Sequence, residues 1–297
     1  MRNTKKKSHS RRQEEITAWL MLAPNTLGLI AFVLIPIIIA VYISFNEYNA
    51  LQPMTFIGLA NYRALLQDGH FVNSLMRTLQ YALMYVPSIV LFAIILSVTI
   101  NAMLKTPQSI ARTFLFFPYC ISATISGLVW QFLLNHQRGY INRIIVLLGG
   151  QRQPFFGSPN QALASIAVTA FWINIGYNMV IMLAALKDIP QDYYEAASID
   201  GANALQKFFR ITLPQLQYAI TFILIVTTIN SFQVFDQIKI ITGGGPNRST
   251  QVTVHYIYEK AFGHYKLGYA SAMAFVFFLI LFVFSVVQLR TMAKEIE

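Results

Sequence analysis

The segment from Asp188 to Leu216, DIPQDYYEAASIDGANALQKFFRITLPQL, is a long polar interruption between apolar runs. Pro190 is expected to end the preceding helix, because proline lacks the N–H that a helix interior needs. Asp192 can cap a new helix, with Glu195 three residues later in capping-box register. Gly201 suits the left-handed conformation that ends a short helix. The pattern therefore predicts a short helix from Asp192 that ends in a glycine turn.

A second short helix is expected after this turn, over residues 202–209, and Pro214 should close the unit before the next apolar run. Both helices carry aromatic residues, namely Tyr193, Tyr194, Phe208 and Phe209. Exposed aromatic side chains beside polar ones are typical of a docking surface. The alternative is an ordinary amphipathic loop between two membrane helices.

Composition excludes an ordinary soluble domain, since the 297 residues are 56% hydrophobic and only 11% charged. The net charge of +10 does not indicate nucleic-acid binding, because many of the basic residues lie in the N-terminal run RNTKKKSHSRR. A basic tail over residues 1–15, ahead of an apolar segment, is typical of a cytoplasmic tail at an anionic leaflet. The apolar stretch that follows is too long for a signal peptide. Cys120 is the only cysteine, so we expect no disulfide within the chain and a packing role for its thiol.

Six apolar segments are long enough to cross a bilayer, which needs about 20 residues per helix. We expect helices at about residues 19–45, 75–103, 113–134, 162–186, 218–241 and 267–289, with kinks at Pro24 and Pro36. The fold class is therefore an all-α membrane protein with six transmembrane helices, in one membrane domain over residues 16–297. An even number of spans places both termini on one side, and the distribution of Lys and Arg favours the cytoplasm.

The sequence shows no catalytic centre. Gly243-Gly244-Gly245-Pro246 is glycine-rich, but the Lys-Ser/Thr of a phosphate-binding loop does not follow, so we expect a tight turn there. The five histidines show no ligand spacing and are expected in loops or at the surface; they are His9, His70, His136, His255 and His264. We therefore predict that the chain is not an enzyme and has no catalytic residue, cofactor or metal of its own. Energy for any transport must then come from a partner or from an ion gradient.

Polar residues gather within the fourth and fifth predicted helices. The candidates for a substrate path are Trp172, Asn174, Tyr177, Asn178, Thr227, Asn230, Ser231, Gln233 and Asp236. Such groups are costly to expose to lipid, so they should face a cavity or another helix. Neutral amides and hydroxyls beside aromatic rings suit a neutral polyhydroxylated solute, whereas an anion would require a cation at mid-depth. Hydrogen bonding between helices is the alternative for each of these residues.

The opening segment resembles the cytoplasmic coupling (EAA) loop of ABC importer permeases. The resemblance consists of Glu195-Ala196-Ala197, then Asp200-Gly201, then Ile211-Thr212-Leu213-Pro214, in that order. Further segments resemble the maltose and glycerol-phosphate branch of carbohydrate ABC importer permeases; they are FIGLANYRALL, ARTFLFFPYCIS, GLVWQFLLN, TGGGPNRST and LGYASAMAF. The resemblance extends from about Trp19 to the C-terminus.

The resemblance implies a permease subunit that translocates a carbohydrate by alternating access, with a core five-helix unit over about residues 75–290. Its implied partners are a second, homologous permease, two ATPase subunits that carry the ATP and Mg²⁺, and an extracytoplasmic solute-binding protein. It implies a multi-pass protein of a bacterial-type inner membrane. The residues implied to contact the ATPase are Tyr194, Glu195, Ala196, Ala197, Asp200, Gly201, Ala202, Phe208, Ile211, Leu213 and Pro214.

Three other functions stay open at this point. An ABC permease could instead carry glycerol 3-phosphate, an amino acid or phosphate, because the loop alone does not define the substrate. A secondary sugar transporter would be expected to show acidic residues at mid-membrane and an internal repeat, and only Asp236 comes close. A membrane enzyme would need a convergent acid, base or metal constellation, and none is apparent.

Overall fold

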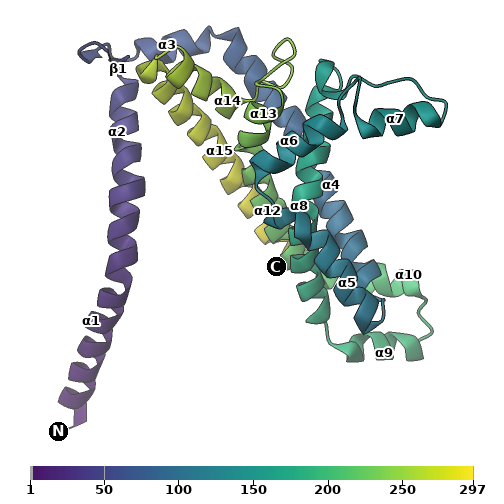
Figure 1. The fold of residues 1–297 in the computed structure, drawn as a ribbon. Helices are drawn as coiled ribbons and strands as arrows, with labels where there is room; N and C mark the ends of the chain where they lie inside the picture. Colours follow the sequence, from purple (N-terminus) through teal and green to yellow (C-terminus); the bar gives the residue numbers. More distant parts are fainter. Residues whose placement is uncertain (1–2, 50, 297) are drawn as a thin grey trace. The chain divides into compact units, whose positions relative to one another are not determined.

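The structure is a computed structural model that describes residues 3–49 and 51–296, and it is mostly helical (Figure 1). The α-helices are α1 (Asn3–Leu29), α2 (Ile35–Ser44), α3 (Ala60–Leu66), α4 (Gly69–Asn101), α5 (Lys105–Phe116), α6 (Ala123–Leu133), α7 (Tyr140–Leu147), α8 (Ala162–Lys187), α9 (Gln191–Ile199), α10 (Ala204–Lys207), α11 (Leu213–Gln215), α12 (Gln217–Phe232), α13 (Asp236–Ile241), α14 (Thr253–Tyr258) and α15 (Leu267–Ile296). Short 3-10 segments are η2 (Phe117–Cys120) and η3 (Phe155–Gly157), and π-helical turns are η1 (Ile30–Leu34), η4 (Phe208–Thr212) and η5 (Glu259–Gly263). Strands β1 (Asn46–Glu47) and β2 (Thr55–Phe56) pair antiparallel, with Asn46 opposite Phe56.

Several of these helices are long and apolar enough to cross a membrane. Single helices meet this test at Thr17–Ser44, Gly69–Asn101, Ala162–Lys187 and Leu267–Thr291. Two bent pairs meet it together, so the described residues contain 4 to 6 candidate spans. The chain is therefore a multi-pass membrane protein. The helix predicted at residues 162–186 matches α8 within one residue.

The predicted third helix, at residues 113–134, is wrong as a single element. It consists of α5 and α6, which are joined through η2 and bent by 100°. Pro118 at the start of η2 cannot donate a backbone hydrogen bond, and Ser122 adopts an extended conformation before α6. Cys120 lies in this connection and is exposed, so the predicted packing role for its thiol is also wrong.

The predicted fifth helix, at residues 218–241, is wrong in the same way. Helix α12 ends at Phe232, and α13 begins again at Asp236. Phe235 leaves helical geometry, with φ −142° and ψ −58°. The break separates the polar residues of this segment into two groups that need not share a helix face.

Pro36 and Pro214 each lie two residues after the end of a π-helical turn, η1 and η4 respectively. The N–H of Ile35 bonds to the carbonyl of Ile30, and Pro36 follows. The N–H of Leu213 bonds to the carbonyl of Phe208, and Pro214 follows. A π-helical turn shifts the hydrogen-bond register just before a residue that lacks a donor. The second helix therefore does not end at residue 209 as predicted but runs from residue 204 to residue 215, and the unit ends one residue after Pro214, at the bend into α12, as predicted.

The chain divides into two compact units. The larger unit comprises residues 68–259 and 277–297, and its core lies where α4 packs on α8 and α12. Ile89, Ile166, Met182 and Ile223 are fully buried there. Because the apolar faces of these helices meet one another, α8 is held with its polar residues in a defined orientation.

The smaller unit comprises residues 1–67 and 260–276 and includes helices α1 to α3. The side-chain nitrogen of Asn61 donates to the carbonyls of Ser44 at 2.8 Å and Asn46 at 3.0 Å. The N–H of Gly268 donates to the carbonyl of Tyr48 at 3.1 Å. A Cβ on Gly268 would lie 2.0 Å from the Asn46 oxygen, so this contact requires glycine. Residues 3–15 of the predicted basic tail belong to α1, and the side chains of residues 1–13, 15 and 16, that of His9 among them, lie outside the described residues.

Candidate functional site

The segment between α8 and α12 is a helix–turn–helix unit built by two capping devices. Helix α9 ends at Ile199, and Gly201 adopts the left-handed conformation, with φ 77°. The N–H of Gly201 bonds to the Ser198 carbonyl at 3.1 Å, and the N–H of Ala202 bonds to the Ala197 carbonyl at 2.8 Å. This pair of bonds is a Schellman motif, which satisfies carbonyls left free at a helix end. The prediction for Gly201 is confirmed.

The predicted cap at Asp192 is wrong. Helix α9 starts at Gln191 with Pro190 at the N-cap position and without a side-chain cap. Asp192 lies within the first turn, where its negative charge interacts favourably with the partial positive charge of the helix N-terminus. A capping box does occur, but at the next helix, where Asn203 and Gln206 bond to each other's backbone N–H groups at 2.9 Å. The sequence N-A-L-Q carries this signal.

Side chains tie the two halves of this unit together. The hydroxyl groups of Tyr194 and Thr212 lie 2.9 Å apart, and Thr212 is buried. The ammonium group of Lys207 donates to the hydroxyl of Ser198 at 2.6 Å. These contacts join α9 to the run from α10 to α11, so that the segment can move as one body.

The same unit exposes four large apolar side chains. Exposed fractions are 49% for Tyr193, 88% for Ile199, 68% for Leu205 and 57% for Phe209. Of the predicted coupling residues, Glu195, Ala196, Asp200, Gly201 and Pro214 are exposed and the other six are partly buried. A rigid body with exposed apolar and acidic groups can bind a partner protein.

A polar cavity of about 220 Å³ lies elsewhere in the larger unit, between α4, α8 and the α12–α13 break. It is lined by Tyr81, Tyr85, Ala123, Ala170, Asn174, Asn230, Gln233, Val234, Phe235, Asp236 and Gln237. Its lining therefore contains amides, phenol rings and one carboxylate, without Lys or Arg. Such a lining offers hydrogen bonds to hydroxyl groups and none of the positive charge that an anion requires.

This cavity brings together four of the predicted path residues, namely Asn174, Asn230, Gln233 and Asp236. The rest do not line it. Thr227 and Ser231 are buried and donate to backbone carbonyls of their own helix, and the side chain of Asn178 donates to the Asn174 carbonyl. Tyr177 stacks on Tyr119 with ring centroids 4.7 Å apart, and Trp172 packs against Trp130.

Tyr81 and Tyr85 were not among the predicted residues. Their rings stack 5.5 Å apart on α4, which brings them to the cavity from a helix that precedes α8 by more than 60 residues. The spacing of i and i+4 in the sequence places them on one helix face. The sequence gives no signal for which cavity that face lines.

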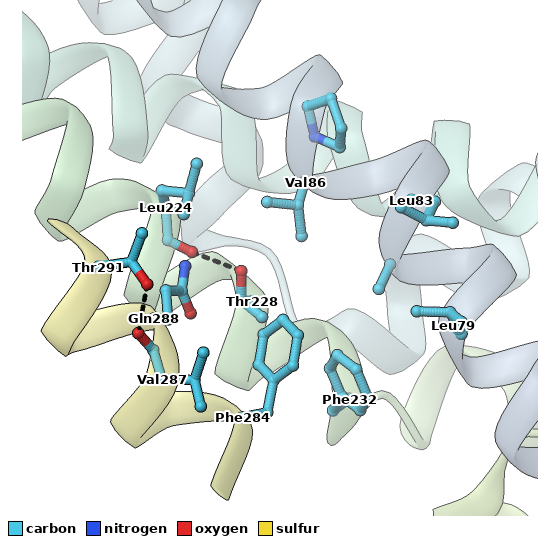
Figure 2. A pocket seen from close by; sticks show the side chains of 12 residues that line it. Leu79, Leu83, Val86, Leu224, Thr228, Phe232, Phe284, Val287, Gln288 and Thr291 are labelled. Carbon is cyan, nitrogen blue, oxygen red and sulfur yellow. Dashed lines mark hydrogen bonds between the residues drawn. The ribbon is translucent and has the colours of Figure 1, made fainter.

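A second cavity of about 440 Å³ is almost entirely apolar (Figure 2). It lies between α4, α12 and α15. The two threonine hydroxyls in its wall donate to their own helix backbone, Thr228 to the Leu224 carbonyl at 2.6 Å and Thr291 to the Val287 carbonyl at 2.9 Å. Hydrocarbon suits this cavity better than a hydroxylated solute.

His255 departs from the expectation that every histidine lies in a loop or at the surface. It lies on α14, is 4% exposed, and has no hydrogen-bond partner on either ring nitrogen among the described residues. The turn that contains Gly243 and Gly244 packs on His255, since a Cβ on Gly244 would lie 3.0 Å from the His255 ring. Burial lowers the pKa of His255, nearby Lys239 lowers it further, and Glu259 partly opposes both effects.

Acid should therefore destabilise the folded chain through His255. The unfolded chain takes up this proton at about pH 6.5, and the folded chain takes it up only at lower pH. Stability is thus retained above that pH and lost as the pH falls below it. We expect the melting temperature of the purified protein to fall between about pH 7 and about pH 5, and to fall less in His255→Gln. Equal pH dependence in both proteins would contradict this assignment.

Comparison with known proteins identifies the family. Residues 55–291 match the family described as binding-protein-dependent transport system inner membrane component. The chain belongs to this family of ABC importer permeases, and the predicted permease class is confirmed.

Its relatives match nearly end to end. The chain is 37% identical over 287 residues to the probable starch degradation products transport system permease protein AmyD of Thermoanaerobacterium thermosulfurigenes, covering 94% of this chain and 95% of the relative. It is 30% identical to the sn-glycerol-3-phosphate transport system permease protein UgpA of Brucella abortus biovar 1, covering 95% of this chain and 97% of the relative. A crystal structure of a bacterial alginate ABC transporter, in complex with an alginate pentasaccharide-bound periplasmic protein, contains a chain of the same fold, with TM-score 0.86, 20% identity, and coverage of 97% of this chain and 98% of that one.

Proposed function

We propose that this chain is one transmembrane subunit of an ATP-driven importer for a neutral carbohydrate. The observation that carries the proposal is the polar cavity of Asn174, Asn230, Gln233 and Asp236 in a chain of this permease family. Amide groups and tyrosine rings suit sugar hydroxyls, and the carboxylate of Asp236 disfavours an anion. The relative named for starch degradation products supports this substrate class.

The proposed topology has six spans with both termini in the cytoplasm. Each bent pair contributes one span in this arrangement, which in the second pair is α12, while the run from α10 to α11 lies outside the bilayer. The unit from α9 to α11 then lies at the cytoplasmic surface. The basic N-terminal run supports this orientation.

The unit from α9 to α11 is the proposed contact with a cytoplasmic ATPase. Its exposed apolar side chains and the acidic groups of Glu195 and Asp200 would enter a cleft of that subunit. ATP binding would move the unit, and the connected α8 and α12 would transmit the movement to the cavity. A second permease and an extracytoplasmic solute-binding protein complete the proposed assembly, in which ATP and Mg²⁺ are bound by the ATPase.

The first experiment is sugar uptake into vesicles that contain the assembled transporter. We expect uptake to require ATP and the binding protein, and to continue after an ionophore collapses ion gradients. Uptake that stops with the gradient and ignores ATP would favour a secondary transporter instead.

Replacing Asn230 tests the cavity. Asn230 is exposed in the cavity wall, so Asn230→Ala should raise the sugar concentration for half-maximal uptake by up to about tenfold, the equivalent of one hydrogen bond, without loss of protein. Thr227→Val is the matched control on the same helix, since Thr227 bonds only to its own backbone. A shift in the control alone would contradict the assigned path.

A further inference from the structure

Helix α7 exposes several large apolar side chains on one side. Its exposed face carries Tyr140, Ile144, Leu147 and Leu148, at positions i, i+4, i+7 and i+8, which share one side of a helix. Their exposed fractions are 53%, 53%, 84% and 83%. A helix in contact with water turns polar residues outward, so this face is built for an apolar environment.

The polar side chain of Asn142 is turned inward. Asn142 is 1% exposed, and its side-chain nitrogen donates to the carbonyls of Asn135 at 3.1 Å and Gln153 at 2.9 Å. Its side-chain oxygen accepts the N–H of Gln153 at 2.7 Å. These bonds fix the rotation of α7, so that the outward apolar face is a feature of the folded segment.

Exposed basic residues lie on this helix and next to it in the chain. Arg138, Arg143 and Arg152 lie on α7 or on its flanking loops and are exposed. The sequence contains no Asp or Glu between Asp68 and Asp188, so these charges meet no local acidic residue. An aliphatic strip flanked by cations complements an anionic lipid surface.

Position in the chain also points to the membrane surface. Helix α7 connects α6 to α8, and Figure 1 shows it projecting sideways near the start of α8, away from the end that leads to α9. The 26 residues of α8 span about 39 Å at about 1.5 Å per residue, enough to cross the hydrocarbon layer. Helix α7 therefore begins where a membrane-spanning helix reaches the interface.

We propose that α7 lies in the membrane interface opposite α9, with its apolar face among the acyl chains and its arginines against anionic lipid headgroups. Tyr140 sits at the depth that amphipathic aromatic side chains favour. The helix fixes the depth of α6 and α8 in the bilayer at the end where α7 lies. This inference rests on the chain being a membrane protein and is independent of the transported solute.

A nitroxide label on α7 tests the proposal in the full chain. Leu147→Cys, in a Cys120→Ser background, is labelled in vesicles of phosphatidylcholine with and without phosphatidylglycerol. We expect the label to be accessible to oxygen and protected from an aqueous nickel chelate. Asn160→Cys is the matched control, since Asn160 is an exposed polar residue of the same connection, and its label should be open to the chelate.

A charge variant tests the headgroup contact. Arg143→Gln should raise the ratio of water-exposed to lipid-immersed label about fivefold in the anionic vesicles and leave it unchanged in phosphatidylcholine alone. A label at residue 147 as open to the chelate as the one at residue 160 would overturn the proposal. Protection that appears only after the partner subunits are added would also overturn it, in favour of protein docking.

Discussion

Gly201→Pro is expected to abolish sugar uptake while the chain still inserts into the membrane. Gly201 has φ 77°, whereas proline fixes φ near about −65°, so the α9 turn cannot form around proline. The variant also loses the N–H that bonds to the Ser198 carbonyl. Because the exposed apolar side chains of this unit depend on the position of α9, the surface proposed to contact the ATPase would be lost. Uptake and ATPase activity of the assembled transporter are the measurements.

Two controls separate the turn from the rest of the unit. Alanine can adopt the left-handed conformation at a cost of about 1–2 kcal/mol, so Gly201→Ala should retain part of the uptake. Glu195→Lys leaves the turn intact but reverses the charge of an exposed residue, and it should reduce uptake without lowering the melting temperature. Normal uptake by Gly201→Pro would contradict the proposed role of this segment in contacting the ATPase.

Gly176→Val is expected to prevent accumulation of folded protein. Helix α8 passes so close to α5 that a Cβ on Gly176 would lie 1.9 Å from the carbonyl oxygen of Leu115 and 2.8 Å from the Cα of Phe116. These are backbone atoms, so a side-chain rotation cannot relieve the clash. The cost should exceed the about 1–3 kcal/mol typical of overpacking in a core. The yield of monodisperse protein in mild detergent measures the effect.

Gly127→Ala is the matched control for this contact. A Cβ there would meet side-chain atoms of Ile241, the nearest at 3.2 Å, which can shift by a few tenths of an ångström. The gain of about 1 kcal/mol in helix propensity then offsets much of the strain. Equal losses in Gly127→Ala and Gly176→Val would contradict the claim that the α5–α8 contact requires glycine.

Long apolar runs were predictable from the sequence, whereas breaks inside them were not. Helix α8 is continuous, and both of its ends were placed within one residue. The 100° bend between α5 and α6 interrupts a segment whose apolar character continues, and the nearest breaker, Pro118, lies in η2 ahead of the bend. Hydropathy measures composition along the chain and does not indicate where a helix changes direction. The α12–α13 break contains neither Gly nor Pro and gave no signal at all.

The candidate sites show the same difference between local features, which the sequence predicts, and long-range contacts, which it does not. The glycine turn at Gly201 follows from a local rule, and the structure has it. The cavity depends on contacts between distant helices, so Tyr81 and Tyr85 could not be paired with Asn174 from the sequence. The spacing of Thr227, Asn230 and Ser231 is typical of one helix face, yet Thr227 and Ser231 are buried and bonded to their own helix, and only Asn230 reaches the cavity.

The central claim is that this permease works with an ATPase and a second permease, and co-purification tests it most directly. The chain is purified from native membranes in mild detergent, and the proteins that accompany it are identified by mass spectrometry. We expect an ATPase with a phosphate-binding loop and a second, homologous permease, and Gly201→Pro should lose the ATPase but keep the permease. Recovery of the chain alone, with sugar uptake that collapses when the ion gradient is removed, would contradict the account.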